Sequence, residues 1–219
     1  MADGANIGYT RATSVAEATT ARGEFRAGGT DLQERLRSQC GGPGGHALVD
    51  LRDVPGLDAI EVGPSGATIG ALVRLAEVGA HPGLRAAYPA LTLPARELAT
   101  PQIRSMATMG GVLCQRTRCA YYRHPDLACP KKGNADSCPS RDGFHQRGVC
   151  FDFGPCVYPH PSSLGCALLT YDAAVEVAGR GRISVAELYG DGSDPTRDHT
   201  LEPGELITRV VLPAPEAGE

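Results

Sequence analysis

The amino-acid sequence predicts an α+β fold, and three observations lead to this class. Short segments rich in Val, Ile and Leu are mixed with short helical segments without strict alternation, which favours α+β over a doubly wound sheet. The 28 glycines and 17 prolines indicate many loops in a folded chain. Six of the eight cysteines lie within residues 114–156, a polar stretch with little apolar periodicity that cannot pack a core of its own.

Residues 9–37 predict a turn, a short helix, a strand, a glycine turn and a second helix. Thr13 or Ser14 is a suitable cap for the first helix, and Glu17 follows Ser14 at the spacing of a capping box. The strand that follows ends at Ala27 and leads through a glycine pair into the second helix. A strand and a helix are therefore expected on either side of the glycine pair.

Residues 46–213 predict further short strands and helices. Several segments rich in Val, Ile and Leu are bounded by turn residues, which is typical of strands. The expected strands occupy residues 46–51, 58–62, 67–72 and 204–213. The expected helices occupy residues 73–80 and 84–99, ahead of the cysteine-rich segment.

Two glycine pairs, Gly28-Gly29 and Gly110-Gly111, are candidates for ligand binding. Paired glycines let the backbone adopt positive φ and approach a ligand without a Cβ in the way. Where such a turn opens a helix, its N–H groups converge on an anion site suited to a pyrophosphate. Thr30 and Thr108 add a hydroxyl beside each turn. Taken alone, either pair is more simply explained as a tight turn, and neither matches the GxGxxG or Walker pattern.

Composition and charge argue against several classes of protein. The formal net charge is −4 and charged residues make up 21% of the chain, so neither disorder nor a nucleic-acid partner is expected. No apolar run approaches the roughly 20 residues that a membrane span requires. The N-terminus lacks the charged start and apolar stretch of a secretory signal. We therefore expect a cytoplasmic protein whose cysteines are ligands or free thiols rather than disulfides.

Four segments, in this order, resemble successive signatures of one known family: FRAGGTDL, IGALVRLAEV, ATPQIRSMATMGGVL and LEPGELITRVVLP. The resemblance is to the FAD-binding medium subunit of molybdenum hydroxylases, the xanthine dehydrogenase and carbon monoxide dehydrogenase flavoprotein family, and it covers residues 9–213. It implies a PCMH-type FAD-binding domain over residues 1–213, with FAD between subdomains at about 9–55 and 56–213. Residues 214–219 would form a tail.

The resemblance also implies which residues bind FAD, with the two glycine turns on either side of its pyrophosphate. By position, the cofactor-binding residues are Phe25, Arg26, Ala27, Gly28, Gly29, Thr30, Asp31, Leu32, Thr108, Gly110, Gly111, Ser163 and Ile207. Two positions depart from the family, since Val112 replaces an Asn and Ser163 stands where the family tends to have Asp. We expect each change to cost on the order of 1 kcal/mol of cofactor binding.

The cysteine-rich segment, residues 114–156, resembles an insertion found in one branch of this family. That branch carries an extra [4Fe–4S] cluster and includes the aldehyde oxidoreductase FAD subunit and the 4-hydroxybenzoyl-CoA reductase β subunit. The resemblance implies four ligands: Cys119, Cys129, Cys138 and Cys156. Four thiolate–iron bonds would offset the ordering entropy of a loop with few apolar groups. Of the other cysteines, Cys114 and Cys150 would lie near the cluster, and Cys40 and Cys166 would be small buried residues.

Zinc is the alternative occupant of a four-cysteine site. Structural zinc sites usually contain a tight Cys-x₂₋₄-Cys pair, and the closest pair here, Cys114 and Cys119, has four residues between its cysteines. Three histidines could complete a mixed zinc site: His124, His145 and His160. Spacing alone leaves iron–sulfur and zinc open. Lys131 and Lys132, beside Cys129, either offset the charge of a cluster or are an ordinary solvated pair.

The resemblance implies an electron-transfer subunit with no catalytic residue for the organic substrate, which would be an aldehyde, xanthine or an aromatic CoA ester. Its partners would be a large molybdopterin-binding subunit and a small [2Fe–2S] subunit in a hetero-oligomer, and FAD would pass electrons to an external acceptor. Relatives continue past residue 213 into a C-terminal subdomain, which we expect to be absent here or supplied separately, with weakened FAD binding. The alternatives are a flavin-free assembly subunit with a metal-clipped loop, and a free-standing zinc domain.

Overall fold

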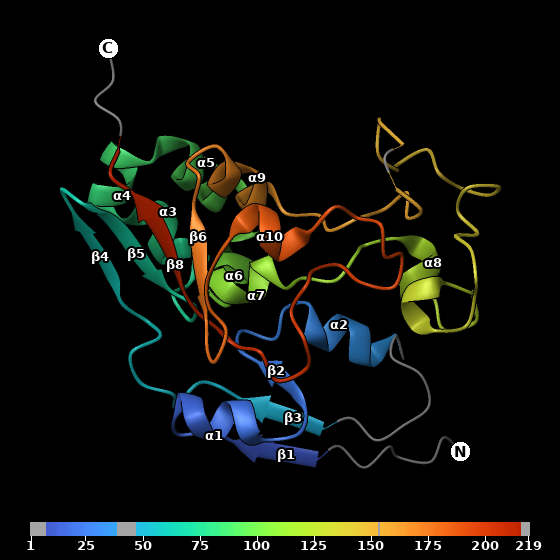
Figure 1. The fold of residues 1–219 in the computed structure, drawn as a ribbon, viewed down its shortest axis with the longest axis horizontal. Helices are drawn as coiled ribbons and strands as arrows, with labels where there is room; N and C mark the ends of the chain where they lie inside the picture. Colours follow the sequence, from blue (N-terminus) through green and yellow to red (C-terminus); the bar gives the residue numbers. More distant parts are fainter. Residues whose placement is uncertain (1–7, 39–46, 153, 216–219) are drawn as a thin grey trace.

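The computed structural model describes residues 8–38, 47–152 and 154–215, whose strands form two sheets (Figure 1). The small sheet is parallel, in the order β1-β3-β2, and consists of β1 (Gly8–Arg11), β2 (Glu24–Arg26) and β3 (Ala47–Asp50). The large sheet is antiparallel, in the order β4-β5-β8-β6-β7. Its strands are β4 (Ile60–Gly63), β5 (Gly66–Gly70), β6 (Ala174–Val177), β7 (Gly181–Ser184) and β8 (Ile207–Pro213). The predicted α+β class is confirmed.

Two short helices accompany the small sheet, α1 (Val15–Thr20) and α2 (Leu32–Arg37). Ser14 caps α1, because its side chain accepts a hydrogen bond from Glu17 N at 3.1 Å. The Glu17 carboxylate reaches back one residue further than a capping box does and accepts from Thr13 N at 2.8 Å. The cap predicted from the sequence is confirmed at Ser14.

Asp50, at the end of β3, anchors the small sheet. Its side chain is fully buried and accepts hydrogen bonds from the Tyr9 hydroxyl, from Arg26 Nη1 at 2.6 Å and from Arg52 N at 3.0 Å. Burial alone would raise the pKa of Asp50, but these hydrogen bonds outweigh burial and hold the pKa below its ordinary value. The carboxylate therefore stays charged at neutral pH and ties three segments together.

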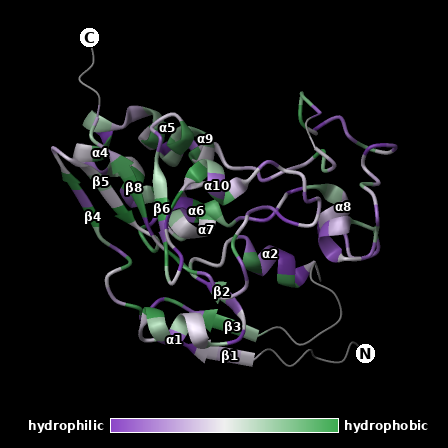
Figure 2. Cartoon of the chain, in the orientation of Figure 1, coloured by the Kyte–Doolittle hydropathy of each residue, from purple (hydrophilic) through white to green (hydrophobic). Residues whose placement is uncertain are grey.

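A further set of helices packs on the large sheet, and we call the sheet and these helices the large unit; the helices supply half of the buried residues of its core. They are α3 (Leu75–Ala80), α4 (Pro82–Ala87), α5 (Pro89–Glu97), α6 (Pro101–Arg104), α7 (Met109–Leu113), α9 (Ser163–Leu169) and α10 (Val185–Tyr189). Figure 2 shows the hydrophobic residues concentrated in this unit. The single helix expected over residues 84–99 is divided at Tyr88, because Pro89 disfavours helical backbone in the residue before it.

Strand β8 holds the large sheet together from the far end of the chain. It pairs with β5 on one side and β6 on the other, so that Val210 lies opposite both Ile69 and Val175, and all three are fully buried. Its last residue, Pro213, accepts a hydrogen bond from the Tyr88 hydroxyl at 2.6 Å. Strand β8 begins at Ile207, and Figure 1 shows this end of β8 pointing toward the small sheet.

The cysteine-rich segment lies beside these units as a long irregular stretch (Figure 1). The structure gives it only α8 (Ala120–Arg123) and a 3₁₀ turn, η1 (Pro130–Lys132), within its described residues. Its own buried cluster is small and consists of Cys119, Tyr122 and Cys129, with Tyr121 and Tyr158 packed against it. Apolar packing alone thus contributes little to ordering this segment.

Candidate functional site

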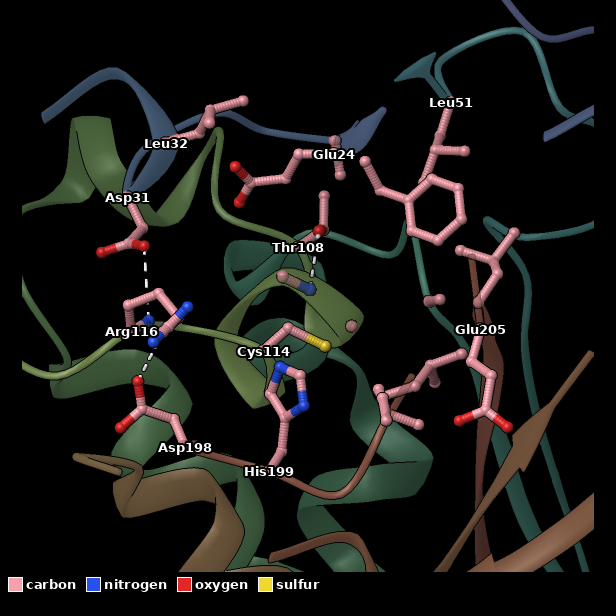
Figure 3. Close-up of a pocket in the computed structure, with 18 of the residues that line it drawn as sticks. Glu24, Asp31, Leu32, Leu51, Thr108, Cys114, Arg116, Asp198, His199 and Glu205 are labelled. Carbon is pink, nitrogen blue, oxygen red and sulfur yellow. Dashed lines mark hydrogen bonds and ion pairs between the residues drawn. The ribbon is translucent and has the colours of Figure 1, made fainter. Parts of the chain in front are cut away.

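A large cavity of about 740 Å³ lies where the small sheet, α2, α7 and the segment before β8 meet (Figure 3). Both glycine turns predicted from the sequence line this cavity. So do Phe25 and Leu51 from the small sheet and Ile207 from β8. The volume falls within the range of about 300–1,000 Å³ that is typical of small-molecule and cofactor sites.

The first glycine turn is shaped by close approach to the backbone just before Thr108 and α7. A Cβ on Gly28 would lie 1.9 Å from Met106 O, three residues before Met109 begins α7. Gly29 has φ +71°, a conformation that favours glycine. Within the described residues, no hydrogen bond uses the backbone N–H groups of Gly28, Gly29 or Thr30, which leaves three donors beside the cavity.

The second glycine pair, Gly110-Gly111, is not a tight turn with positive φ as expected but forms the first turn of α7, which packs against β5; we keep the name second glycine turn for it. Thr108 caps the helix by accepting from Gly111 N at 3.3 Å, so its own hydroxyl hydrogen can still be donated into the cavity (Figure 3). A Cβ on Gly110 would lie 2.9 Å from the Cβ of Ala71, and Gly110 N donates to Ala71 O at 2.9 Å. Gly110 is therefore needed for helix packing, and Thr108 is the polar group that this turn offers a ligand.

Most of the predicted cofactor residues meet in this cavity. Those that line it are Phe25, Ala27, Gly28, Gly29, Thr30, Asp31, Leu32, Thr108, Gly110, Gly111 and Ile207. Two do not line it. The Arg26 side chain leaves toward Asp50, because neighbouring residues of a strand point to opposite faces. Ser163 is an exposed residue in the first turn of α9, and the buried Ser162 before it serves as the helix cap.

Asp31 holds protein groups rather than facing the cavity freely. Its carboxylate forms ion pairs with Arg35 Nε at 2.9 Å and Arg123 Nη2 at 2.6 Å, and it accepts from Arg116 N at 3.3 Å. It thereby ties α2 to the start of the cysteine-rich segment. Val112, which replaces the Asn of the family, is 7% exposed and packs into the core of the large unit.

Four residues that sequence reasoning did not place in the site also line the cavity: Cys114, Arg116, Asp198 and His199 (Figure 3). Burial raises the pKa of Cys114 to about 12. Burial and the Arg116 charge lower the pKa of His199. Both side chains are therefore neutral at pH 7. No local pattern in the sequence marks these positions, because contacts between distant segments bring them together.

The four cysteines predicted as metal ligands come together in a second, small cavity, which we call the cysteine cavity. Its volume is about 10 Å³, and Cys119, Cys129, Cys138 and Cys156 all line it, together with Lys131. Within the described residues, no group of three or more His, Cys, Asp or Glu side chains is arranged to hold a single metal ion. Burial raises the pKa of Cys129 and of Cys156, so without a bound metal these thiols are protonated.

The remaining candidates lie away from the cysteine cavity. His160 stacks on Tyr189 with ring centroids 4.5 Å apart, and His124 and His145 are exposed. The expectation that Cys166 is buried is wrong, since it lies on the exposed face of α9; Cys40 lies outside the described residues. Lys131 is not part of a solvated pair, because its side chain is only 2% exposed.

Comparison with known proteins places this geometry in a family. The profile of the FAD binding domain in molybdopterin dehydrogenase matches residues 5–215. The chain is 35% identical to the aldehyde oxidoreductase FAD-binding subunit PaoB of Escherichia coli (strain K12), over 96% of this chain and 69% of PaoB. It is 25% identical to the nicotinate dehydrogenase FAD-subunit of Eubacterium barkeri, over 87% of this chain and 50% of that protein.

The fold agrees with solved structures. The chain superposes on a chain of the reconstituted CO dehydrogenase from Oligotropha carboxidovorans with a TM-score of 0.65 and 24% identity, covering 98% of this chain and 61% of that one. No helix within the described residues is both long enough and apolar enough to cross a membrane. With a profile matched over nearly its whole length, this chain belongs to the family of FAD-binding domains of molybdopterin dehydrogenases, which are oxidoreductases.

Proposed function

We propose that this chain is the FAD-binding electron-transfer part of a molybdopterin dehydrogenase that oxidises an aldehyde. The observation that carries the proposal is the meeting of two glycine turns, from different units of the fold, across one cavity of about 740 Å³. The 35% identity to an aldehyde oxidoreductase subunit supports the substrate class. Residues 9–55 and 56–213 are the two subdomains in this account, and the division of the strands between two sheets supports that boundary.

The residues of the large cavity fit FAD. The N–H groups of Gly28, Gly29 and Thr30 and the hydroxyl of Thr108 would hold the diphosphate from two sides. Apolar side chains at the other end of the cavity, Phe25 and Ile207 among them, would cover the rings. FAD supplies reversible acceptance of electrons. We assign no catalytic residue for the organic substrate to this chain.

A large molybdopterin-binding subunit and a small [2Fe–2S] subunit are the proposed partners in a hetero-oligomer. They would oxidise the substrate and deliver its electrons to this chain, which would pass them to an external acceptor. The chain spans 69% of PaoB and 61% of the matched CO dehydrogenase chain.

We also propose that the cysteine cavity binds a [4Fe–4S] cluster through Cys119, Cys129, Cys138 and Cys156. Four thiols that approach one enclosed space from four separate places in the chain have the donor chemistry of such a cluster. A single zinc ion requires all its ligands about 2.0–2.3 Å from one point, and the described side chains form no such group. In a [4Fe–4S] cluster each thiolate binds a different iron, so the four sulfur atoms lie further apart than they would around one zinc ion. The cluster supplies one-electron transfer, and the narrow cavity must widen to admit it.

Flavin, iron and zinc content per chain test both proposals in the complex purified without oxygen. We expect one FAD, four irons and no zinc. Cys138→Ser should lower the iron content, whereas Cys166→Ser, at an exposed thiol outside the cavity, should not. Zinc with no iron would contradict the cluster, and unchanged iron in Cys138→Ser would contradict the ligand assignment. Iron without flavin would replace the electron-transfer role with that of a flavin-free assembly subunit.

A further inference from the structure

A buried ionic bridge lies between the large cavity and the cysteine cavity. It consists of Arg116, Lys131 and Asp198, and we call these three residues the ionic bridge. Arg116 Nε lies 2.6 Å from Asp198 Oδ2, and Lys131 Nζ lies 3.0 Å from Asp198 Oδ1. The side chains of Lys131 and Asp198 are 2% and 0% exposed. Charges buried to this degree are stable only while they remain paired, so each member depends on the others keeping their positions.

The ionic bridge belongs to the walls of both cavities. Arg116 and Asp198 line the large cavity, and Lys131 lines the cysteine cavity. The backbone follows the same division, since residues 196–199 line the large cavity and Pro195 lines the cysteine cavity. Thr117, which also lines the cysteine cavity, donates its backbone N–H to Asp198 Oδ2 at 3.3 Å. One wall, with Asp198 at its centre, therefore separates the two cavities.

Arg116 and Lys131 both belong to the cysteine-rich segment, but Arg116 lies at its start against the large cavity, whereas Lys131 lies beside the proposed ligand Cys129. Lys131 lies in η1, two residues after Cys129, and its Nζ also donates to Arg197 O at 2.5 Å. The buried apolar cluster of that segment is small, so thiolate–iron bonds would be its main anchor. If those bonds are lost, Lys131 moves with its segment while Asp198 stays buried in the wall of the large cavity.

We propose that the ionic bridge makes FAD binding depend on the occupancy of the cysteine cavity, with Lys131 and Asp198 as positioning residues. This inference rests on the proposed cluster and extends it. With the cluster in place, Lys131 holds Asp198, and Asp198 holds Arg116 and residues 196–199 against the large cavity. Without the cluster, Asp198 loses a partner, and this wall shifts away from the flavin nucleotide. Because such coupling is reciprocal, bound FAD also strengthens cluster binding by the same factor.

The test measures the dissociation constant of FAD by flavin fluorescence on the full chain in its complex, in cluster-loaded and cluster-free forms, with iron counted in each. We expect cluster-free wild type to bind FAD about tenfold more weakly than the loaded form. Lys131→Met should bind FAD weakly in both forms, so that the ratio of the cluster-free to the cluster-loaded dissociation constant falls to about one. Lys131→Arg keeps the positive charge and should restore the wild-type ratio. The matched control is Lys132→Met, since Lys132 Nζ donates to His124 O away from Asp198 and should leave the wild-type ratio unchanged.

Three outcomes are possible that contradict the account, and each would overturn a different part of it. A wild type with four irons whose FAD affinity is the same in both forms overturns the coupling and leaves the cluster standing. A wild type without iron overturns the proposed cluster itself. A Lys131→Met variant that keeps the full wild-type ratio overturns the role of Lys131. If Lys131→Met does not fold, Asp198→Asn makes the same test, because it removes the charge at the centre of the ionic bridge and keeps the shape of the side chain.

Discussion

Replacing Gly28 with Ala should push the two glycine turns apart. The added Cβ would lie 1.9 Å from Met106 O and 2.7 Å from its carbonyl carbon, and neither backbone atom can rotate out of the way. Cβ atoms essentially never approach a neighbour closer than 3.0 Å, so the two segments must separate by at least 1.1 Å, the difference between that limit and the 1.9 Å. The strain is steric, because Gly28 does not have positive φ.

The expected cost follows from this overlap. Overpacking of a well-packed contact destabilises a protein by about 1–3 kcal/mol, and a clash between two backbones belongs at the upper end, near 2–3 kcal/mol. The same displacement moves the N–H groups of the first turn away from a diphosphate that also contacts Thr108. Losing one hydrogen bond to a charged group costs about 1.5–3 kcal/mol, which corresponds to at least tenfold weaker FAD binding.

Urea unfolding of the FAD-free chain measures the first effect, and a flavin fluorescence titration measures the second. The matched control is Gly63→Ala at the end of β4, where an added Cβ meets no atom within 4 Å and φ is not positive. We expect Gly63→Ala to match wild type in both measurements. If Gly28→Ala also matches wild type, the two turns do not form a shared cradle, and the account of the large cavity fails.

Three further predictions concern stability. Burial lowers the pKa of His160 to about 4. Between that value and the unfolded value of about 6.5 only the unfolded state takes up the proton, so the free energy of unfolding should fall by about 3 kcal/mol as pH falls through this window. His160→Phe should flatten the dependence of the unfolding free energy on pH, measured by urea titrations at several pH values. An unchanged dependence would show that His160 is not the group responsible. Asp50, whose pKa is lowered, contributes stability above an unfolded pKa of about 3.9 that is lost as pH falls. Asp50→Asn should cost about 2 kcal/mol at pH 7, the range for hydrogen bonds to a charged group, and remove this acid dependence, whereas equal stability at pH 7 would show that the charge is not needed. Val112→Asn should lower stability by about 1–3 kcal/mol without tightening FAD binding, because Val112 faces the core; tighter binding would show that residue 112 reaches the cofactor.

Local signals in the sequence predicted the elements whose ends depend on one or two residues. Ser14 caps α1 and Gly29 has the positive φ of a turn, because caps and positive φ need particular side chains or none, whereas Gly110 and Gly111 lie within α7 without positive φ. The break at Tyr88 is also a local effect of Pro89, but continuous apolar spacing across residues 84–99 suggested one helix. The order of strands in the large sheet, with β8 between β5 and β6, depends on the pairing of β5 with β8, whose residues lie more than a hundred positions apart.

The candidate site was predictable where the backbone forms it and less so where side chains do. The two glycine pairs line the large cavity and the four cysteines line the cysteine cavity, while their roles as FAD and cluster ligands stay predictions. Arg26 was misplaced because alternate residues of a strand face opposite ways, and Phe25 takes the cavity side. Arg116 and Asp198 were missed because 81 intervening residues separate the two ends of their ion pair.

The most direct test of the central claim is an experimental density map of the chain with FAD bound. The account predicts the diphosphate between the turn at Gly28-Gly29 and the start of α7, within hydrogen-bonding distance of the N–H groups of the first turn and the Thr108 hydroxyl. A diphosphate elsewhere, or FAD held outside the large cavity, would contradict it.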